Sequence, residues 1–180
     1  MYVREEPSLL RQMVRWIVDI VTVISIAWFM VFALGTQITI TGQSMEPLLE
    51  QGETVLMNRL SYLVTGPDRM DLVAFEKEEG NYNIKRVIGL PGETVQIQNG
   101  QIYIDGELLI WSGKPQTADL AGLAEKPVQL KKNEYFLLGD NRANSEDSRF
   151  SAVGNVERRQ IKGKIWLRIR PFGRFGLIRS

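Results

Sequence analysis

The spacing of apolar residues divides the chain at Gly35. From Trp16 to Leu34 nearly every residue is apolar, and Asp19 is the only charged one. This run approaches the ~20 apolar residues that a helix needs to cross a bilayer, so it predicts a transmembrane helix at residues 16–34. A cleavable signal has a shorter apolar core and a small-residue cleavage site. Since no convincing site of that kind follows, we expect a retained anchor; a buried core helix is the alternative.

Beyond Gly35 the apolar period becomes two, which is typical of β-strands. The expected strands cover residues 37–41, 70–75, 84–90, 95–98, 101–104, 134–138 and 164–169. Asn99-Gly100, between two of them, favours a tight hairpin turn, whereas the Gly-, Ala- and Pro-rich residues 111–127 predict a loop or small cap. The pattern therefore predicts an all-β domain over residues 36–180. We expect a partly closed β-barrel in which residues 93–130 form a smaller inserted β subdomain.

Basic residues are distributed unevenly around the predicted helix. Arg4, Arg11 and Arg15 precede it, and the next basic residue is Arg59. Under the positive-inside rule, residues 1–15 are expected in the cytoplasm and residues 36–180 on the extracytoplasmic side of the cell membrane. The chain is thus predicted to be a single-pass membrane protein.

The amino-acid composition excludes several kinds of catalytic site. The 180 residues include 22 Lys+Arg and 21 Asp+Glu but no His and no Cys. A Ser-His-Asp triad, a His- or Cys-ligated metal, a thiol nucleophile and a disulfide are all excluded. The nearly balanced charge gives no indication of nucleic acid as a partner. Any hydrolase in this chain must take its general base from Lys, Asp, Glu or Tyr.

Three polar segments contain the candidate chemistry. Ser44, in residues 42–47, follows the first strand and lies close to the end of the predicted helix. Lys85 lies in the apolar strand at 84–90, where burial would lower its pKa enough for it to act as a base; a solvent-facing lysine is the alternative. Residues 139–149 are rich in Gly, Asn, Asp and Ser, which fits either a solvated loop or hydrogen-bonding support for an active site.

Taken in order, these segments resemble the bacterial type I signal peptidases. Ser44 to Pro47 with Gly52-Glu53 resembles the family's nucleophile box, and Lys85 to Glu93 resembles its general-base box. Residues 69–75, 139–149 and 163–166 are similar to three further boxes. Each motif is modest alone, but their ordered conjunction over most of residues 14–170 is specific.

The resemblance implies a role for each matching residue. Ser44 would be the nucleophile, Lys85 the general base, and Ser145 the residue that orients the Lys85 amine. Two ion pairs, Arg86 with Asp140 and Asp147 with Arg149, would hold the loop in place. The substrates would be signal peptides of exported preproteins, cleaved at the bilayer without a cofactor or metal. The candidate substrate-pocket residues are Ile38, Ile40, Gly42, Met45, Leu49 and Ile84.

The chain departs from the family pattern at several positions. Gly42 replaces a serine whose hydroxyl completes the oxyanion hole in many members, so the second oxyanion donor is open. Arg69 and Glu93 stand where Gly or Asp is common, and residues 150–153 differ from the usual aromatic-Gly pair.

Two other functions remain open at this stage. One is a self-cleaving Ser/Lys regulator of the repressor type, which the N-terminal span disfavours. The other is a non-enzymatic β module tethered to a membrane. The C-terminal residues are either an ordinary tail or a membrane-contacting segment, and they are Arg170, Phe172, Arg174, Phe175, Leu177, Ile178 and Arg179.

Overall fold

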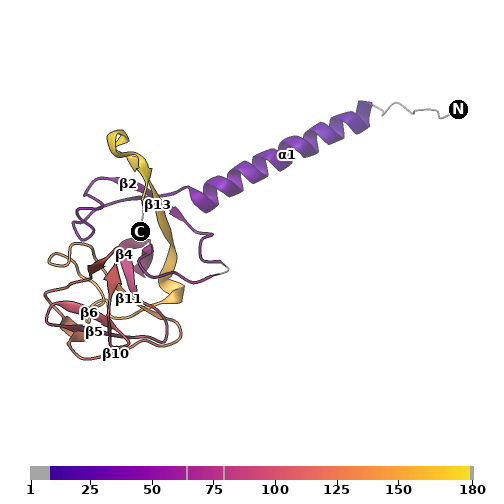
Figure 1. Ribbon diagram of the computed structural model, residues 1–180. Coiled ribbons are helices and arrows are strands. Elements are labelled where there is room, and N and C mark those ends of the chain that lie inside the picture. Colours follow the sequence, from indigo (N-terminus) through magenta and orange to yellow (C-terminus); the bar gives the residue numbers. More distant parts are fainter. Residues whose placement is uncertain (1–8, 64, 79, 179–180) are drawn as a thin grey trace.

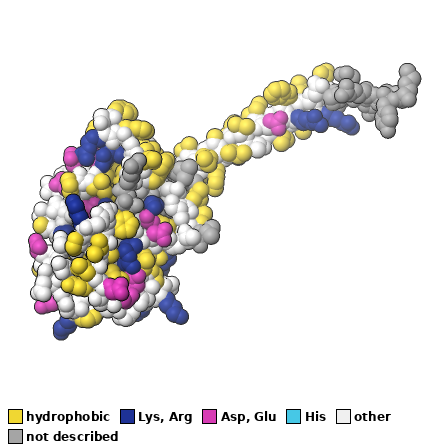
Figure 2. Space-filling model, viewed as in Figure 1, with side chains coloured by type: hydrophobic (Ala, Val, Ile, Leu, Met, Phe, Trp, Pro, Cys, Tyr) yellow, Lys and Arg dark blue, Asp and Glu magenta, His cyan; other side chains and the backbone are white. Residues whose placement is uncertain are grey.

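A single helix projects from a β-sheet domain in the computed structural model, which describes residues 9–63, 65–78 and 80–178 (Figure 1). Helix α1 spans Leu9–Leu34. Residues Leu9–Phe32 are long and apolar enough to cross a membrane, and none of this stretch is buried against the rest of the protein. Apolar side chains cover most of the helix surface in Figure 2.

Helix α1 extends beyond the predicted transmembrane span of residues 16–34 and begins at Leu9. Leu9, Leu10, Met13 and Val14 extend its apolar surface, and Arg11 is also in this first part. Arg and Leu both have high helix propensity, so the basic residues do not end the helix. Arg4 and Arg179, used in the predictions above, lie outside the described residues.

The main sheet has eight strands in the order β1-β2-β13-β3-β4-β11-β12, with β14 also paired to β13. Its strands are β1 (Thr36–Thr39), β2 (Thr54–Asn58), β3 (Leu72–Glu78), β4 (Asn81–Gly89), β11 (Glu134–Leu138), β12 (Val156–Glu157), β13 (Ile161–Arg170) and β14 (Gly176–Leu177). Short 3-10 turns, η2 (Arg158–Gln160) and η3 (Phe172–Arg174), flank β13. The all-β prediction with one N-terminal helix is confirmed.

Strand β4 is paired along only part of one side. Strand β3 pairs with it from Asn81 to Arg86, whereas β11 pairs only with Arg86, Val87 and Gly89. Strand β1 pairs with β2 alone. Within the described ranges, β1 and the first half of β4 therefore each keep an edge free of strand partners.

A second sheet lies between β4 and β11 in the sequence. It has the order β10-β5-β6-β7, formed by β5 (Thr94–Gln98), β6 (Gln101–Ile104), β7 (Glu107–Leu108) and β10 (Val128–Gln129). Strands β8 (Ile110–Trp111) and β9 (Lys114–Pro115) pair with each other, and η1 covers Gly122–Glu125. Part of the expected loop at 111–127 is thus short regular structure.

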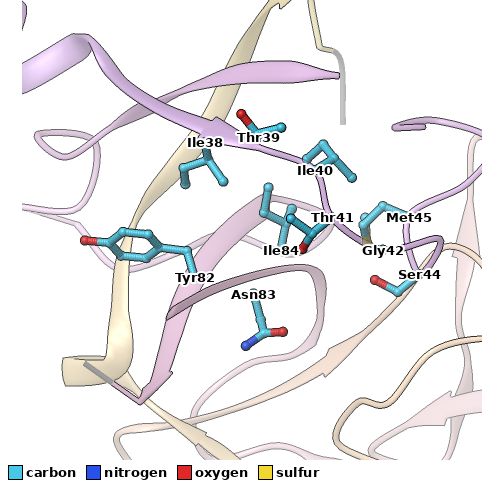
Figure 3. Close-up of a pocket in the computed structure, with 10 residues that line it drawn as sticks. All are labelled: Ile38, Thr39, Ile40, Thr41, Gly42, Ser44, Met45, Tyr82, Asn83 and Ile84. Carbon is cyan, nitrogen blue, oxygen red and sulfur yellow. The ribbon is translucent and has the colours of Figure 1, made fainter. Parts of the chain in front are cut away.

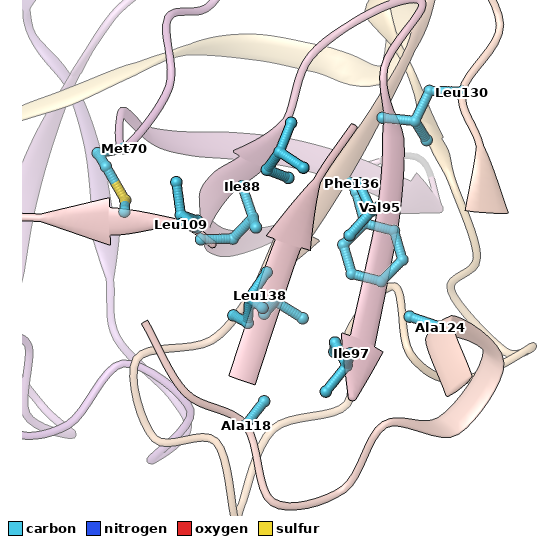
Figure 4. Packing of buried hydrophobic residues seen from close by; sticks show 12 residues of the cluster. Met70, Ile88, Val95, Ile97, Leu109, Ala118, Ala124, Leu130, Phe136 and Leu138 are labelled. Atoms are coloured by element: carbon cyan, nitrogen blue, oxygen red, sulfur yellow. The ribbon is translucent and has the colours of Figure 1, made fainter. Parts of the chain in front are cut away.

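The two sheets share a hydrophobic core. Val95 and Ile97 of the second sheet pack in one cluster with Ile88, Phe136 and Leu138 of the main sheet (Figure 4). Residues 94–129 therefore form a separate sheet without a separate core. Their description as an inserted subdomain remains a prediction.

Candidate active site

Ser44 lies on a loop, residues 40–53, that joins β1 to β2 and is here called the Ser44 loop. Its ends are held together by hydrogen bonds from Ile40 N to Glu53 O and from Gly52 N to Ile40 O, both 2.8 Å. Met45 and Leu49 on this loop are buried in a core cluster with Ile40. Because these apolar side chains point inward, Ser44 stays half-buried at the surface.

Lys85 lies in β4 and is only 4% exposed. It is paired with Val73 in the β3 ladder, two residues from the Phe75–Asn83 pair, so Lys85 and Asn83 share a face of the sheet. Burial lowers the pKa of Lys85 from 10.5 to about 8, while the charges of Asp147 and Glu146 act in the opposite direction. The amine is therefore neutral in a substantial fraction of molecules near pH 8.

Ser44 and Lys85 line one cavity of about 220 Å³, here called the lysine cavity. Its other lining residues are Gly42, Gln43, Phe75, Lys77, Asn83, Asn144, Glu146 and Val153. A hydroxyl and a neutral amine at one cavity provide the two groups that Ser/Lys acyl transfer requires.

Residues 139–149, here called the Ser145 loop, rest on the Ser44 loop. The Asn141 backbone N–H donates to Ser44 O at 3.0 Å, and its side-chain amide donates to Gln43 O at 3.1 Å. A Cβ added at Gly139 would overlap the Ser145 hydroxyl and lie 2.5 Å from Ser44 O. Only glycine at position 139 allows the two loops to come this close. The close contact places Ser145 beside the Ser44 backbone.

The Ser145 hydroxyl is available for a further hydrogen bond. The side chain is 6% exposed, and among the described residues its Oγ has no hydrogen-bond partner. A buried hydroxyl without a partner is unfavourable. It therefore favours any arrangement in which a hydrogen-bond donor or acceptor turns toward it.

A groove of about 100 Å³, here called the apolar groove after the isoleucine side chains in its lining, starts at Ser44 and runs between the free edges of β1 and β4. Figure 3 shows Ile38 and Ile40 on one side, Tyr82 and Ile84 on the other, and Ser44 at one end. The remaining lining residues are Thr39, Thr41, Gly42, Met45 and Asn83. Five of the six predicted pocket residues line this groove, whereas Leu49 is wholly buried in the core.

Comparison with known proteins assigns the family. A profile described as signal peptidase, peptidase S26, matches residues 13–169. Signal peptidase IB of Staphylococcus aureus is 32% identical over 184 residues, which cover 92% of this chain and 93% of that protein. The chain belongs to the signal peptidase family.

A second curated relative agrees with this assignment. Probable signal peptidase I-2 of Synechocystis is 33% identical over 146 residues, or 77% of this chain and 65% of that protein. A solved signal peptidase I from Enterococcus faecalis is 29% identical, with a TM-score of 0.43 over 56% of this chain and 97% of that one. The chain is thus a serine endopeptidase of the signal peptidase I type, which sets aside a self-cleaving repressor and a non-enzymatic module.

Arg86 and Asp140 form one of the two ion pairs expected in a signal peptidase. Arg86 Nε donates to Asp140 Oδ1 at 2.7 Å and Nη2 donates to Oδ2 at 2.6 Å. Arg86 Nη1 also donates to Met70 O at 2.9 Å. This two-point contact fixes the first residues of the Ser145 loop to the strand that carries Lys85.

Asp140→Ala is expected to lower the free energy of unfolding by about 3 kcal/mol, because it leaves the largely buried Arg86 guanidinium without its carboxylate. Urea unfolding of the detergent-solubilised protein measures this change. Ser44→Ala is the matched control and should unfold like the wild type. An Asp140→Ala protein with the wild-type unfolding midpoint would show that the pair has no structural role.

Asp147 and Arg149 form the second expected pair, and both side chains are completely shielded from solvent. Arg149 Nε donates to Asp147 Oδ1 at 2.8 Å, and Nη2 donates to Oδ2 at 2.9 Å. Arg149 also donates to the carbonyls of Leu120 and Arg142, while Gly139 N donates to Asp147. The pair joins both ends of the Ser145 loop to the segment at Leu120, between β9 and η1.

Two of the departures from the signal peptidase pattern lie together in the structure. Arg69 Nη2 and Glu93 Oε1 are 2.5 Å apart, and Arg69 also donates to Ile88 O. The two unusual side chains therefore compensate each other's charge. At Gly42, an added Cβ would meet no atom within 4 Å, so the loop does not require glycine there for space.

Glu53 is a supporting residue that sequence reasoning did not identify. Its buried carboxylate lies 2.9 Å from Arg168 Nε and 2.9 Å from Arg174 Nη1. Arg174 also pairs with Glu50. The C-terminal strand and turn thus hold the far end of the Ser44 loop, while Phe172 nearby is 82% exposed. In the sequence, the Gly52-Glu53 pair after the nucleophile residues was the feature that could have indicated this role for Glu53.

The site offers no obvious place for a metal. Over residues 9–63, 65–78 and 80–178, no group of three or more Asp or Glu side chains is arranged to hold a metal ion.

Proposed function

We propose that this protein is a membrane-anchored signal peptidase that uses Ser44 as its nucleophile and Lys85 as its general base. The observation that supports this most directly is the lysine cavity, which is lined both by Ser44 and by a buried lysine with a pKa of about 8. Signal peptide cleavage is the activity of the family. The dyad explains how a chain without His or Cys carries it out.

The reaction proceeds through an acyl-enzyme. Ser44 Oγ bonds to the scissile carbonyl carbon while neutral Lys85 takes its proton. The C–N bond then breaks, and the Lys85 ammonium returns the proton to the leaving amine. Water attacks the ester with Lys85 again as the base, which releases the signal peptide and restores the Ser44 hydroxyl. The Ser44 backbone N–H donates to the oxyanion in this mechanism, a contact typically worth ~3 kcal/mol.

The substrate binds as an extended strand in the apolar groove. The free edges of β1 and β4 offer backbone groups on both sides, so a peptide can add to the sheet by strand pairing. Alternate side chains of a strand point to the same face. The residues one and three positions before the cut therefore enter the groove together, and its small volume admits only small side chains.

Phe at either of these two positions in a precursor is expected to abolish cleavage, because an aromatic ring does not fit a cavity of about 100 Å³ that already receives a neighbouring side chain. Incubating purified enzyme with Ala- and Phe-bearing precursors measures this directly. A Phe at position two before the cut is the control and should be tolerated. Efficient cleavage of both test precursors would contradict the assignment of the groove.

Helix α1 anchors the enzyme in the bilayer. It ends at Leu34, immediately before β1, so Ser44 lies within a short length of chain from the membrane surface. The Arg residues near its start place that end in the cytoplasm. The catalytic domain then faces the side on which exported proteins emerge.

Single-cysteine labelling tests this orientation, because the chain has no natural Cys. An impermeant thiol reagent applied to intact cells should label Lys114→Cys, at an exposed position in β9, and should not label Ser8→Cys. The reverse labelling pattern would overturn the proposed topology.

A further inference from the structure

Ser44 lies where two cavities with different lining side chains meet. The apolar groove and the lysine cavity share Gly42, Ser44 and Asn83. Lys85 lines only the lysine cavity, and the isoleucines line only the groove. A substrate that reaches Ser44 through the groove must therefore continue past Ser44 on the side of the lysine cavity.

The proposed chemistry assigns these two sides. Lys85 must deliver its proton to the nitrogen of the scissile bond, so the leaving amine has to lie against Lys85. The signal peptide forms the ester with Ser44 and occupies the groove. The first residue of the mature protein then occupies the lysine cavity.

Two charged side chains, Lys77 and Glu146, line this cavity in addition to Lys85, and both are exposed. Lys77 is four positions along β3 from Val73, the partner of Lys85, which corresponds to roughly 13 Å along the strand. Glu146 directly follows Ser145, and its charge acts on Lys85. Among the described residues, Glu146 is therefore the acidic side chain that lines the lysine cavity.

Glu146 is not engaged elsewhere in the structure. No ion pair or hydrogen bond joins its carboxylate to another side chain within the described ranges of the chain. Asp140 and Asp147, by contrast, are fully paired with arginines. A carboxylate without such a partner at the leaving-group side is available to a substrate.

We propose that the lysine cavity is the leaving-group subsite and that Glu146 sets its charge preference at the first residue of the mature protein. This inference rests on the proposed Ser44/Lys85 mechanism. A basic side chain there is attracted to Glu146, and an acidic one is repelled. The same carboxylate stabilises the new α-amine as it gains a proton from Lys85.

Two precursors that differ only in Lys or Glu at the first residue after the cut test the proposal with the full-length enzyme in detergent. The wild type should cleave the Lys precursor with the higher kcat/KM. Glu146→Gln should reduce that preference by up to about fivefold, as expected for an exposed charge pair, and Glu146→Lys should reverse it. Any effect of Glu146 on Lys85 itself changes kcat/KM for both precursors equally, so it cancels in the ratio of the two kcat/KM values.

Glu107→Gln is the matched control, since it removes the same charge from an exposed position in β7 and should leave the preference at the wild-type value. A preference that is unchanged in both Glu146 variants would overturn the proposal. So would a preference that follows charge at position two before the cut, because the cavity would then receive the signal peptide. Failure of the dyad itself is recognised separately, as cleavage of both precursors by Ser44→Ala.

Discussion

Replacing Lys85 with arginine is expected to stop precursor cleavage at every pH at which the wild-type enzyme works. Arginine retains the positive charge but does not lose its proton in proteins, so it cannot accept the proton of Ser44. General acid–base groups contribute roughly 10²–10⁴-fold to rate. A fall of at least that size in kcat/KM is the expected result, measured on a signal-peptide-bearing precursor.

The wild-type pH profile supplies a second readout of the same residue. Only neutral Lys85 acts as the base, and burial lowers its pKa from 10.5 to about 8. Activity should therefore rise with pH along a limb that reflects loss of one proton, with its midpoint near pH 8. A limb centred near the ordinary lysine value would show that Lys85 is not held in a desolvated site.

Stability provides the control for folding. The folded state binds the Lys85 proton less tightly than the unfolded state does. Below about pH 8 the buried charge therefore lowers the free energy of unfolding by its full amount, and this penalty decreases as the pH rises from 8 toward 10.5. The depressed pKa corresponds to about 3 kcal/mol. Lys85→Met should thus be inactive yet more stable than the wild type at neutral pH. Substantial activity in a folded Lys85→Arg or Lys85→Met protein would remove Lys85 from the mechanism.

Local patterns predicted those parts of the fold that local chemistry decides. Asn99 and Gly100 both have positive φ in the β5–β6 turn, which is the conformation that made this dipeptide a hairpin signal. The apolar run at 16–34 predicted the helix because a membrane span depends on composition and length. Resemblance to the family then indicated Ser44 and Lys85. Their shared cavity depends on how the strands pair, which local sequence patterns do not specify.

Features that depend on distant partners were not predicted. Strand β2 buries Val55 and Met57, but Leu56 between them is also apolar and hides the alternation. Glu53 contacts Arg168 and Arg174 because β13 pairs with β2, which brings distant parts of the chain together. Arg69 and Glu93 appeared as two separate departures, and their pairing emerges only once the fold brings them together. Leu49 was among the predicted pocket residues, and its side chain is buried in a core cluster.

Asp147→Asn is expected to lower the free energy of unfolding by about 3–5 kcal/mol, the range found when one partner of a buried ion pair is removed. The asparagine side chain keeps the shape of Asp147, so the effect isolates the lost charge. It leaves the guanidinium of Arg149, which is completely shielded from solvent, without a counter-ion. Urea unfolding in detergent measures the change.

The exposed Arg159–Glu157 pair offers the control, because Glu157→Gln removes a similar contact at the surface and should change stability by less than ~1 kcal/mol. Asp147→Asn should also affect catalysis in a defined direction. Asp147 is the charge that most strongly opposes the lowering of the Lys85 pKa, so its removal should shift the activity limb to lower pH. If Asp147→Asn is less stable but its activity limb keeps the wild-type midpoint, the role of Asp147 is limited to holding the loop. If the variant has wild-type stability, Arg149 finds another partner and the buried pair does not fix the Ser145 loop.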